Sequence, residues 1–228
     1  SLVLTDLPDK IRQVNTCEIT NRKEYMDAER DLIMYLQKYK DADDDKIAKA
    51  MRGEVMVRIN ILRQISARGK VRDVIEFVKD FRENGKKIIL FCSLHEVVDQ
   101  LKRYFRTAVS VTGRDSQDEK QRAVDAFQNN PKADIIICSI KAAGVGLTLT
   151  ASSNVAFVEF PWTYADCCQC EDRAHRIGQK DSVTCYYFLG RRTIDEKVYR
   201  IIQEKKNIAN AVTGSTEDIE ENIVDMVA

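Results

Sequence analysis

The 228-residue chain is poor in proline and has neither an excess of charge of one sign nor a long hydrophobic run. Only three prolines occur, and no stretch is of low complexity. Lys+Arg and Asp+Glu both count 36, which argues against a histone-like polycation but leaves room for a local phosphate-binding face. No apolar run is long enough to span a membrane and no signal peptide precedes Thr5. We therefore expect a soluble intracellular protein without a membrane partner, in the cytoplasm or nucleoid of a prokaryote or the nucleus of a eukaryote.

The chain also lacks the cysteine pattern of a disulfide scaffold, because its seven cysteines are an odd number. Cys92 and Cys138 close apolar runs that are typical of buried strands, which indicates reduced thiols and no disulfide partner. A Cys-x-x-Cys at 167–170, with His175 nearby, leaves a zinc site as an alternative. Because no second Cys-x-x-Cys occurs, we favour reduced packing cysteines and expect no metal site.

Two motifs of nucleotide-binding proteins are missing. No Gly-x-x-x-x-Gly-Lys-[Ser/Thr] P-loop occurs, and no Asp-Glu pair follows an apolar strand as a magnesium-binding carboxylate pair would. Gly144-Val145-Gly146 is not a dinucleotide fingerprint, because Thr148-Leu149 occupies the place of the third glycine. The sequence therefore offers no nucleotide cradle of its own.

What is present indicates a well-packed core and long solvated helices, since 44% of the residues are hydrophobic and 32% are charged. Residues 1–20 predict an extended lead-in that contains a strand from 11 to 20. Residues 23–66 carry two apolar stripes at helical spacing, separated by the acidic turn 41–45, and predict a helical hairpin. We interpret the hairpin as a structural protrusion, with a coiled-coil partner site as the less favoured alternative.

From residue 69 onward, strand and helix patterns alternate, which predicts an α/β fold with a parallel sheet flanked by helices on both faces. A long closing helix is expected over 193–212 and a short one over 216–227. The remaining expected strands are 88–92, 108–111, 135–138, 155–160 and 183–189, and the remaining expected helices are 71–81, 94–105 and 116–127.

Chemistry-bearing residues follow four of these strands, where parallel sheets place their ligands. Hydroxyls, amides freed by glycine, and arginines are suited to phosphates. The stretches are Ser93, Thr112-Gly113-Arg114, Ser139–Thr148 and Pro161-Trp162-Thr163.

The stretch 169–179 comes directly after the last of these loops. A helix through it would place Arg173 and Arg176 on one face, as two guanidinium forks aimed at one phosphate, and would end at Gly178. The alternative is two surface arginines paired with neighbouring carboxylates. We expect His175 to be structural or to make an orienting hydrogen bond.

These motifs, in this order, resemble the second RecA-like lobe of superfamily-two helicases. The string 172–179 is similar to the sixth motif of SWI/SNF-type DNA translocases, and 142–151 to their fifth. Residues 7–12 resemble the segment where that family crosses from the first lobe to the second. The resemblance covers nearly the whole chain, 1–228, and is nearest to the annealing-helicase branch and its bacterial relatives. It makes 23–66 the family's protrusion and 193–228 its closing helices.

The resemblance implies roles for individual residues. Arg173 and Arg176 would be arginine fingers that reach ATP, with Mg²⁺, on a first RecA-like lobe of the same full-length protein. The nucleotide cleft would be lined by Gly144, Gly146 and Gln169. The backbone of double-stranded DNA would be contacted, with weak sequence preference, by Ser93, Thr112, Gly113, Arg114 and Thr148.

Because the P-loop and the Asp-Glu box are absent, we expect an excised lobe that hydrolyses no ATP by itself. The alternative function is a non-catalytic DNA- or protein-binding module on the same rim. An RNA helicase lobe is disfavoured by the ending Ile177-Gly178-Gln179 and by the helical insertion.

Overall fold

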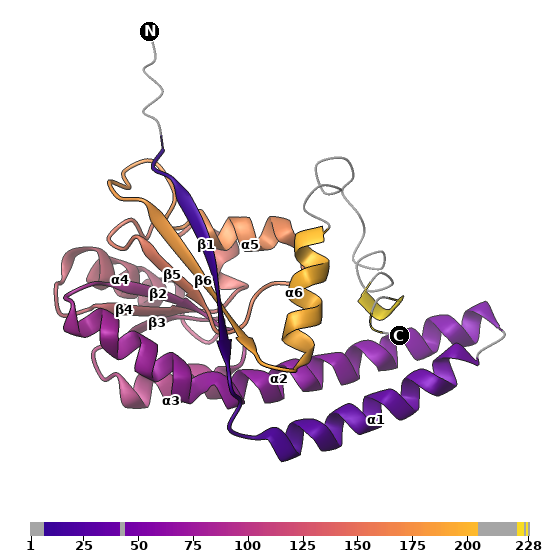
Figure 1. Ribbon diagram of the computed structural model, residues 1–228. Coiled ribbons are helices and arrows are strands. Elements are labelled where there is room, and N and C mark those ends of the chain that lie inside the picture. Colours follow the sequence, from indigo (N-terminus) through magenta and orange to yellow (C-terminus); the bar gives the residue numbers. More distant parts are fainter. Residues whose placement is uncertain (1–6, 42–43, 205–222, 226, 228) are drawn as a thin grey trace, which may run out of the picture. The chain divides into compact units, whose positions relative to one another are not determined.

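The computed structural model describes residues 7–41, 44–204, 223–225 and 227. In these residues helices alternate with the strands of one sheet (Figure 1). No helix within the described ranges combines the length and the apolarity needed to cross a membrane. The elements are, in order, β1 (Lys10–Cys17), α1 (Arg22–Lys40), α2 (Asp45–Glu83), β2 (Ile88–Phe91), α3 (His95–Tyr104), β3 (Val109–Val111), α4 (Gln117–Asn129), β4 (Ile135–Cys138), the 3-10 turn η1 (Ala142–Val145), β5 (Asn154–Phe157), α5 (Tyr164–Glu171), β6 (Val183–Gly190) and α6 (Ile194–Glu204).

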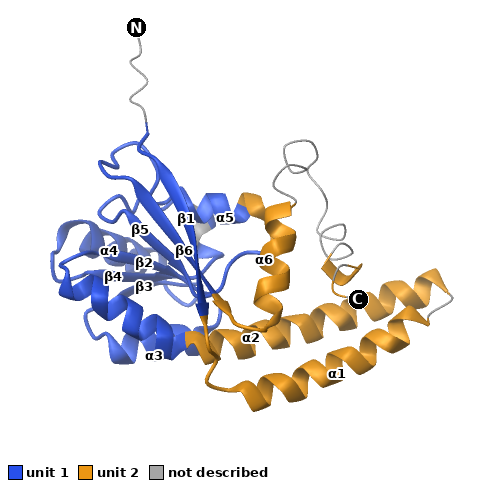
Figure 2. Cartoon of the chain, viewed as in Figure 1, with its two compact units in different colours: residues 1–16, 71–161, 166–188 blue, residues 17–70, 162–165, 189–228 orange. Residues whose placement is uncertain are grey.

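The chain forms two compact units, coloured separately in Figure 2. Unit 1 comprises residues 1–16, 71–161 and 166–188 and contains most of the sheet, and unit 2 comprises residues 17–70, 162–165 and 189–228 and contains the helical hairpin and α6.

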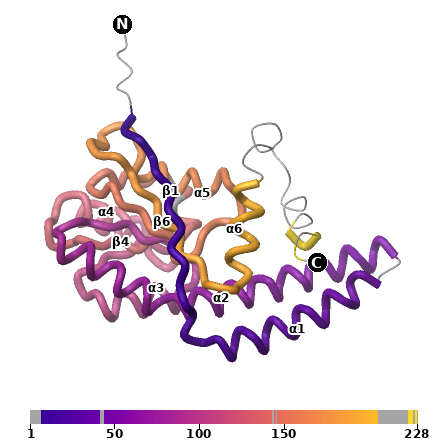
Figure 3. The backbone as a smooth tube through the Cα atoms, viewed as in Figure 1, coloured from indigo at the N-terminus to yellow at the C-terminus, as the bar shows by residue number. Residues whose placement is uncertain are grey.

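The sheet has the strand order β1-β6-β5-β2-β4-β3, and the pairings from β6 to β3 are all parallel. β1 lies beside β6 although the two come from opposite parts of the sequence (Figure 3). β2 and β4 are buried along their whole length, as continuous apolar runs between two layers of helices should be. Right-handed crossovers place α3 and the last part of α2 on one face, and α4 and α5 on the other. The predicted parallel α/β sheet is therefore confirmed.

The predicted hairpin forms, but its second helix is longer than expected. The sequence patterns predict one helix that ends at 66 and another over 71–81, whereas α2 runs without interruption for 39 residues. Gly69, which lies between the two predicted helices, is there because another part of the chain lies against it. A Cβ at this position would lie 2.6 Å from the Cβ of Ile19 and 2.2 Å from Oδ1 of Asn21. The glycine permits a close approach and does not end the helix.

Local capping follows the sequence. Asp44, in the predicted acidic turn, accepts hydrogen bonds from the backbone N–H groups of Lys46 and Ile47, which caps α2. Ser116 and Glu119 form the predicted capping box at the start of α4. Of the expected closing helices, α6 is described to Glu204, and residues 223–225 and 227 are helical; the rest of those predictions lies outside the described residues.

Unit 2 is fastened by a buried ion pair. Asp195 accepts hydrogen bonds from Lys70 at 2.8 Å, from the Ser66 hydroxyl at 2.7 Å and from the Gly190 N–H at 3.0 Å. Burial alone would raise the pKa of Asp195, but the charge of Lys70 and the donated hydrogen bonds outweigh it and lower the pKa. The pair joins α2 to the start of α6.

Candidate functional site

The predicted helix over the two arginines does not form. α5 ends at Glu171, and residues 172–178 are turns, so the expectation that Arg173 and Arg176 share a helical face is wrong. The backbone leaves the helix because its carbonyls bind partners outside it. The Arg173 carbonyl accepts the Leu149 N–H at 2.9 Å, and the chain then turns at Gly178, whose φ is +101°. We call residues 172–179 the arginine segment.

The arginine segment packs on the loop after η1, residues 146–152, so two predicted motifs meet within unit 1. Besides the bond between Leu149 and Arg173, the Nη1 of Arg176 donates to the Leu147 carbonyl at 3.0 Å. The loop begins at Gly146, which adopts the left-handed conformation with φ +75°. We call residues 146–152 the glycine loop.

Gln179 ties the two stretches together from inside. Its Nε2 donates to the carbonyls of Ser152 at 2.8 Å, Ala174 at 3.1 Å and Thr150 at 3.4 Å. Its Oε1 accepts two backbone N–H groups that follow it in the chain. The sequence drew attention to this glutamine only as part of a motif; the structure gives it a packing role that no local pattern reveals.

The electrostatics of Arg173 are unusual for a surface arginine. Its Nε is buried and has no hydrogen-bond partner in the part of the chain that the structure describes. Burial, and then the positive charge of Arg176, lower the pKa of Arg173. A half-buried guanidinium with an unused donor and a like charge beside it is suited to bind an anion. The anion would accept a hydrogen bond from the unused donor and would offset the repulsion between the two positive charges.

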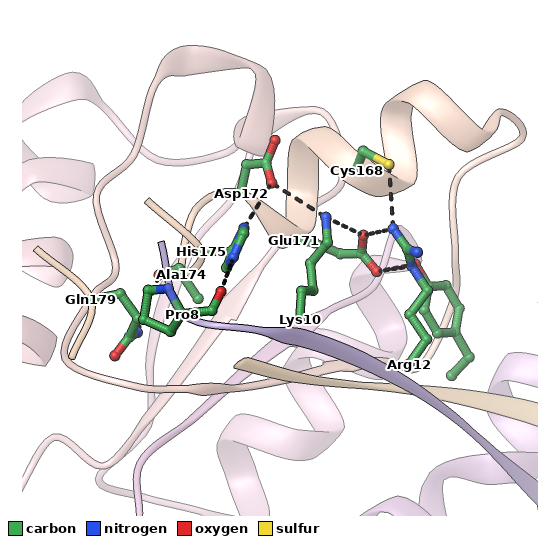
Figure 4. Close-up of polar contacts among 10 residues, drawn as sticks. Pro8, Lys10, Arg12, Cys168, Glu171, Asp172, Ala174, His175 and Gln179 are labelled. Carbon is green, nitrogen blue, oxygen red and sulfur yellow. Dashed lines mark hydrogen bonds and ion pairs between the residues drawn. The ribbon is translucent and has the colours of Figure 1, made fainter. Parts of the chain in front are cut away.

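The carboxylates that precede these arginines are bound elsewhere. Glu171 is fully buried; Arg12 grips it with Nε at 2.8 Å and Nη2 at 2.7 Å, and Lys10 and the Tyr187 hydroxyl add contacts at 3.2 and 2.9 Å (Figure 4). Burial would raise the pKa of Glu171, but the bonds and charges of Arg12 and Lys10 lower it. Among the described residues no carboxylate pairs with Arg173 or with the arginine three residues on, so the surface-pair alternative fails.

His175 makes an orienting hydrogen bond, as expected. Its Nε2 lies 2.6 Å from the Pro8 carbonyl, and its Nδ1 lies 3.9 Å from Asp172 (Figure 4). A ring nitrogen that meets a carbonyl donates to it, so the contact fixes the ring and the turn that carries it.

The other residues predicted for the nucleotide cleft are exposed. Gln169 lies on the exposed side of α5. Gly144 and Gly146 are also exposed, and a Cβ at either would meet no atom within 4 Å. Of these residues, Gly146 begins the glycine loop, in which Leu147 and Leu149 bond to the arginine segment.

The predicted DNA-binding residues differ in exposure and in whether other residues of the chain already bind them. Ser93, Gly113 and Thr148 are exposed, and Thr148 lines an open depression of about 230 Å³ with α4. Thr112 is buried, and Arg114 binds Asp99 through both ends of its fork, at 3.1 and 2.6 Å. The structure thus brings Thr148 to the arginine segment but leaves the residues after β3 in their own local bonds.

Carboxylates that sequence reasoning missed occupy these strand ends. Glu159, two residues after β5, accepts the backbone N–H groups of Ser93 at 2.6 Å and Leu94 at 2.8 Å. Asp115 does the same for Thr112, taking its N–H at 2.6 Å and its hydroxyl at 2.9 Å. Glu159 lies inside the expected strand 155–160 and Asp115 four residues after the expected strand 108–111, so the sequence pattern did not single out either as a partner of strand-end amides.

The cysteines near the arginine segment are packing residues. All seven cysteines of the chain are free thiols. Burial raises the pKa of Cys170 to about 12 and also raises that of Cys167, which opposes the thiolate form that zinc requires. The described ranges contain no cluster of His, Cys, Asp and Glu side chains that could hold a metal ion.

The chain is similar in sequence to known helicases and chromatin regulators. Residues 69–178 match the family described as the helicase conserved C-terminal domain. The chain is 30% identical over 224 residues to the human DNA annealing helicase and endonuclease ZRANB3, covering 94% of this chain and 19% of that protein. It is 33% identical over 145 residues to the SWI/SNF-related matrix-associated actin-dependent regulator of chromatin subfamily A-like protein 1 of Xenopus tropicalis, covering 61% and 15%. The chain therefore spans about a fifth or less of these relatives.

Solved structures share the fold. The C-terminal part of the Fun30 ATPase domain matches with a TM-score of 0.75 and 16% identity, over 97% of this chain and 99% of that one. The Sulfolobus solfataricus SWI2/SNF2 ATPase core in complex with dsDNA matches with a TM-score of 0.73 and 22% identity, over 95% and 49%. Together with the motif order and the sheet topology, these matches identify the chain as a second, C-terminal RecA-like lobe of the SWI/SNF type within superfamily-two helicases.

Proposed function

We propose that this lobe is the second half of the motor of an ATP-dependent double-stranded-DNA translocase, of the chromatin-remodelling or DNA-annealing and repair type. Arg173 and Arg176 act on ATP that a first RecA-like lobe of the same protein holds. The observation that carries the proposal is the buried Nε of Arg173, which has no partner among the described residues and belongs to a guanidinium beside that of Arg176, with which no described carboxylate pairs. An anion would both accept a hydrogen bond from the unpaired Nε and offset the repulsion between the two guanidiniums.

The arginines would work by electrostatic stabilisation and not by proton transfer, since a guanidinium stays protonated at any ordinary pH. Phosphoryl transfer spreads negative charge over the transferring group, and an arginine finger that meets this charge is worth roughly 10³–10⁵ in rate. Arg176 keeps one nitrogen on the Leu147 carbonyl, which fixes its fork while leaving its other donors for phosphate. The Mg²⁺ that accompanies ATP would be bound by carboxylates of the first lobe, because Asp172, the carboxylate of the arginine segment, is already paired with Lys10.

The glycine loop gives the proposed nucleotide side a route to the proposed DNA side. Thr148 lies between Leu147, whose carbonyl accepts the Arg176 side chain, and Leu149, whose N–H bonds to the Arg173 backbone carbonyl. A shift of the Arg176 guanidinium toward phosphate would therefore pull on the Leu147 carbonyl, one residue before Thr148. Ser93, Gly113 and Thr148 are exposed and can contact phosphates as they stand, whereas Arg114 must first leave Asp99.

ATPase assays on the protein that carries this lobe together with its first lobe test the proposal. Arg173→Ala and Arg176→Ala are each expected to lower DNA-stimulated ATPase by about 10³-fold while duplex affinity changes by no more than about twofold. Arg82→Ala, which removes a guanidinium bound to Asp134 in the same unit, is the matched control and should stay near wild type. The 228-residue chain alone should hydrolyse no ATP. ATPase that survives both variants would favour the alternative, a non-catalytic DNA- or protein-binding module.

A further inference from the structure

The residues that lead into the two arginines are bound to one short stretch near the N-terminus. We call residues 8–12 the entering segment. Arg12 holds both oxygens of Glu171 in a fork, and Lys10 reaches Glu171 at 3.2 Å and Asp172 at 3.5 Å (Figure 4). The partners in the fork are 159 residues apart in the sequence. The end of α5 is thus fixed by a distant part of the chain.

A third bond reaches past the first arginine. The Pro8 carbonyl meets the ring of His175 at 2.6 Å, so the entering segment touches the chain on both sides of Arg173. Arg176 follows His175 directly. Outside these bonds, the turn is fixed by the glycine loop and Gln179 on its other side.

The same bonds also decide which charges are neutralised. Glu171 is fully buried, and a fully buried carboxylate is costly unless a cation pairs with it. Because Arg12 and Lys10 satisfy it, Glu171 has no need of Arg173, which lies two residues further on. The entering segment therefore keeps the carboxylate away from the arginine whose Nε lacks a partner among the described residues.

We infer that the entering segment positions the two arginines, so that Arg12 and Lys10 set the rate of ATP turnover through Glu171 and Asp172 without touching the nucleotide. This inference rests on the proposed function. If a first lobe precedes the entering segment, the segment is the covalent connection to it, and movement of that lobe would be passed to Arg173 along the Arg12–Glu171 fork. The positions of Arg173 and Arg176 would then depend on lobe closure as well as on the bound nucleotide.

Steady-state ATPase of the two-lobed protein provides the first test. Arg12→Gln should lower kcat by roughly 10- to 100-fold, as expected when a catalytic group is displaced by about 1 Å, with KM for ATP and duplex affinity nearly unchanged. Arg12→Lys keeps the positive charge but cannot bind both oxygens of Glu171 in a fork, so its kcat should lie between those of the wild type and Arg12→Gln. Arg82→Gln, which breaks another ion pair of the same unit, is the control.

A double-mutant cycle separates positioning from general damage. In an Arg173→Lys background, which already has a misplaced charge, Arg12→Gln should cost no more than about twofold further, because the two changes remove the same interaction. If the losses multiply instead, Arg12 acts independently of Arg173 and the inference is wrong. If Arg12→Gln behaves like Arg82→Gln while Arg173→Ala is inactive, the inference is also wrong but the proposed function stands. If Arg173→Ala retains full activity, the proposed function itself fails.

Hydrogen exchange gives a readout that needs no ATPase. The Leu149 N–H bonds to the Arg173 carbonyl, and the Gln179 N–H bonds to the Arg176 carbonyl. In the 228-residue chain, Arg12→Lys should speed exchange of both amides, whereas Arg82→Lys should leave them unchanged. Equal protection of both amides in the two variants would overturn the inference, even if Arg12→Gln proves too unstable for assay.

Discussion

The side chain of Gln179 offers the sharpest test of how the two motifs are held together. It is nearly buried and makes five hydrogen bonds, three as a donor to carbonyls and two as an acceptor. Gln179→Glu keeps the shape and the acceptor but replaces the donors with a charge that faces three carbonyls. The Ala174 carbonyl keeps the Arg176 N–H, but leaving the buried Ser152 carbonyl unpaired costs about 1–3 kcal/mol, and the buried charge facing three carbonyls adds to this, so we expect a loss of about 2–4 kcal/mol at neutral pH.

The loss should depend on pH in a definite direction. The carbonyls and the burial disfavour the charged form, so the pKa of the carboxyl introduced at position 179 should be raised in the folded state. A raised folded pKa contributes stability that is present below the unfolded pKa of about 4.3 and is lost as pH rises through the folded value. Stability of Gln179→Glu relative to wild type should therefore improve on acidification, when the carboxyl donates one hydrogen bond.

Urea unfolding of the 228-residue chain measures the effect. With a denaturant slope of about 3 kcal/mol per M, the midpoint should fall by about 1 M at neutral pH. Gln169→Glu is the matched control, since the same substitution is made on the exposed side of α5. If the midpoints of the two variants coincide, Gln179 does not hold the arginine segment to the glycine loop, and our account of the site's rigidity is wrong.

Further predictions concern unit 2. Gly69→Ala should destabilise the chain by about 2 kcal/mol or more, because the new Cβ would overlap Ile19 and its neighbourhood, while Gly53→Ala, in open space on the same helix, should stabilise it by up to about 1 kcal/mol; thermal unfolding compares the two. Lys70→Met should cost about 3–5 kcal/mol, since it leaves Asp195 buried without its cation, and urea unfolding measures the loss. Because the pKa of Asp195 is lowered in the folded state, its stabilisation should be present above its unfolded pKa of about 4 and lost as pH falls through the folded value, so acid unfolding of Lys70→Met should show a weaker pH dependence than wild type.

Sequence patterns were most reliable where one residue type repeats along an element. The continuous apolar runs of β2 and β4 predicted strands buried on both faces, and both are confirmed. The capping box at Ser116 was also readable, because its partners are three residues apart. Patterns of this kind depend only on residues that are close in the sequence, and the elements they predict are present in the structure.

The errors arose where distant segments override local preference. The interruption predicted around Gly69 is absent, because the glycine serves a contact with Ile19. The arginine segment has no local helix breaker before Gly178, yet its carbonyls are taken by Leu149 and Gln179. The order of the motifs singled out the two arginines. The fork between Arg12 and Glu171 could not be predicted from the sequence, because its two residues lie 159 positions apart.

The carboxylates at the strand ends set the energetic terms of any contact with a nucleic acid backbone. Glu159 already fills the two amides after β2, and Asp115 fills the N–H and hydroxyl of Thr112. A phosphate that binds there replaces a carboxylate as the acceptor of these hydrogen bonds, so each contact gains little binding free energy. When the phosphate leaves, the carboxylate can accept the hydrogen bonds again, and no donor remains unpaired. For a lobe proposed to move along DNA, the edge of the sheet is thus suited to a grip that is easily exchanged from one phosphate to the next.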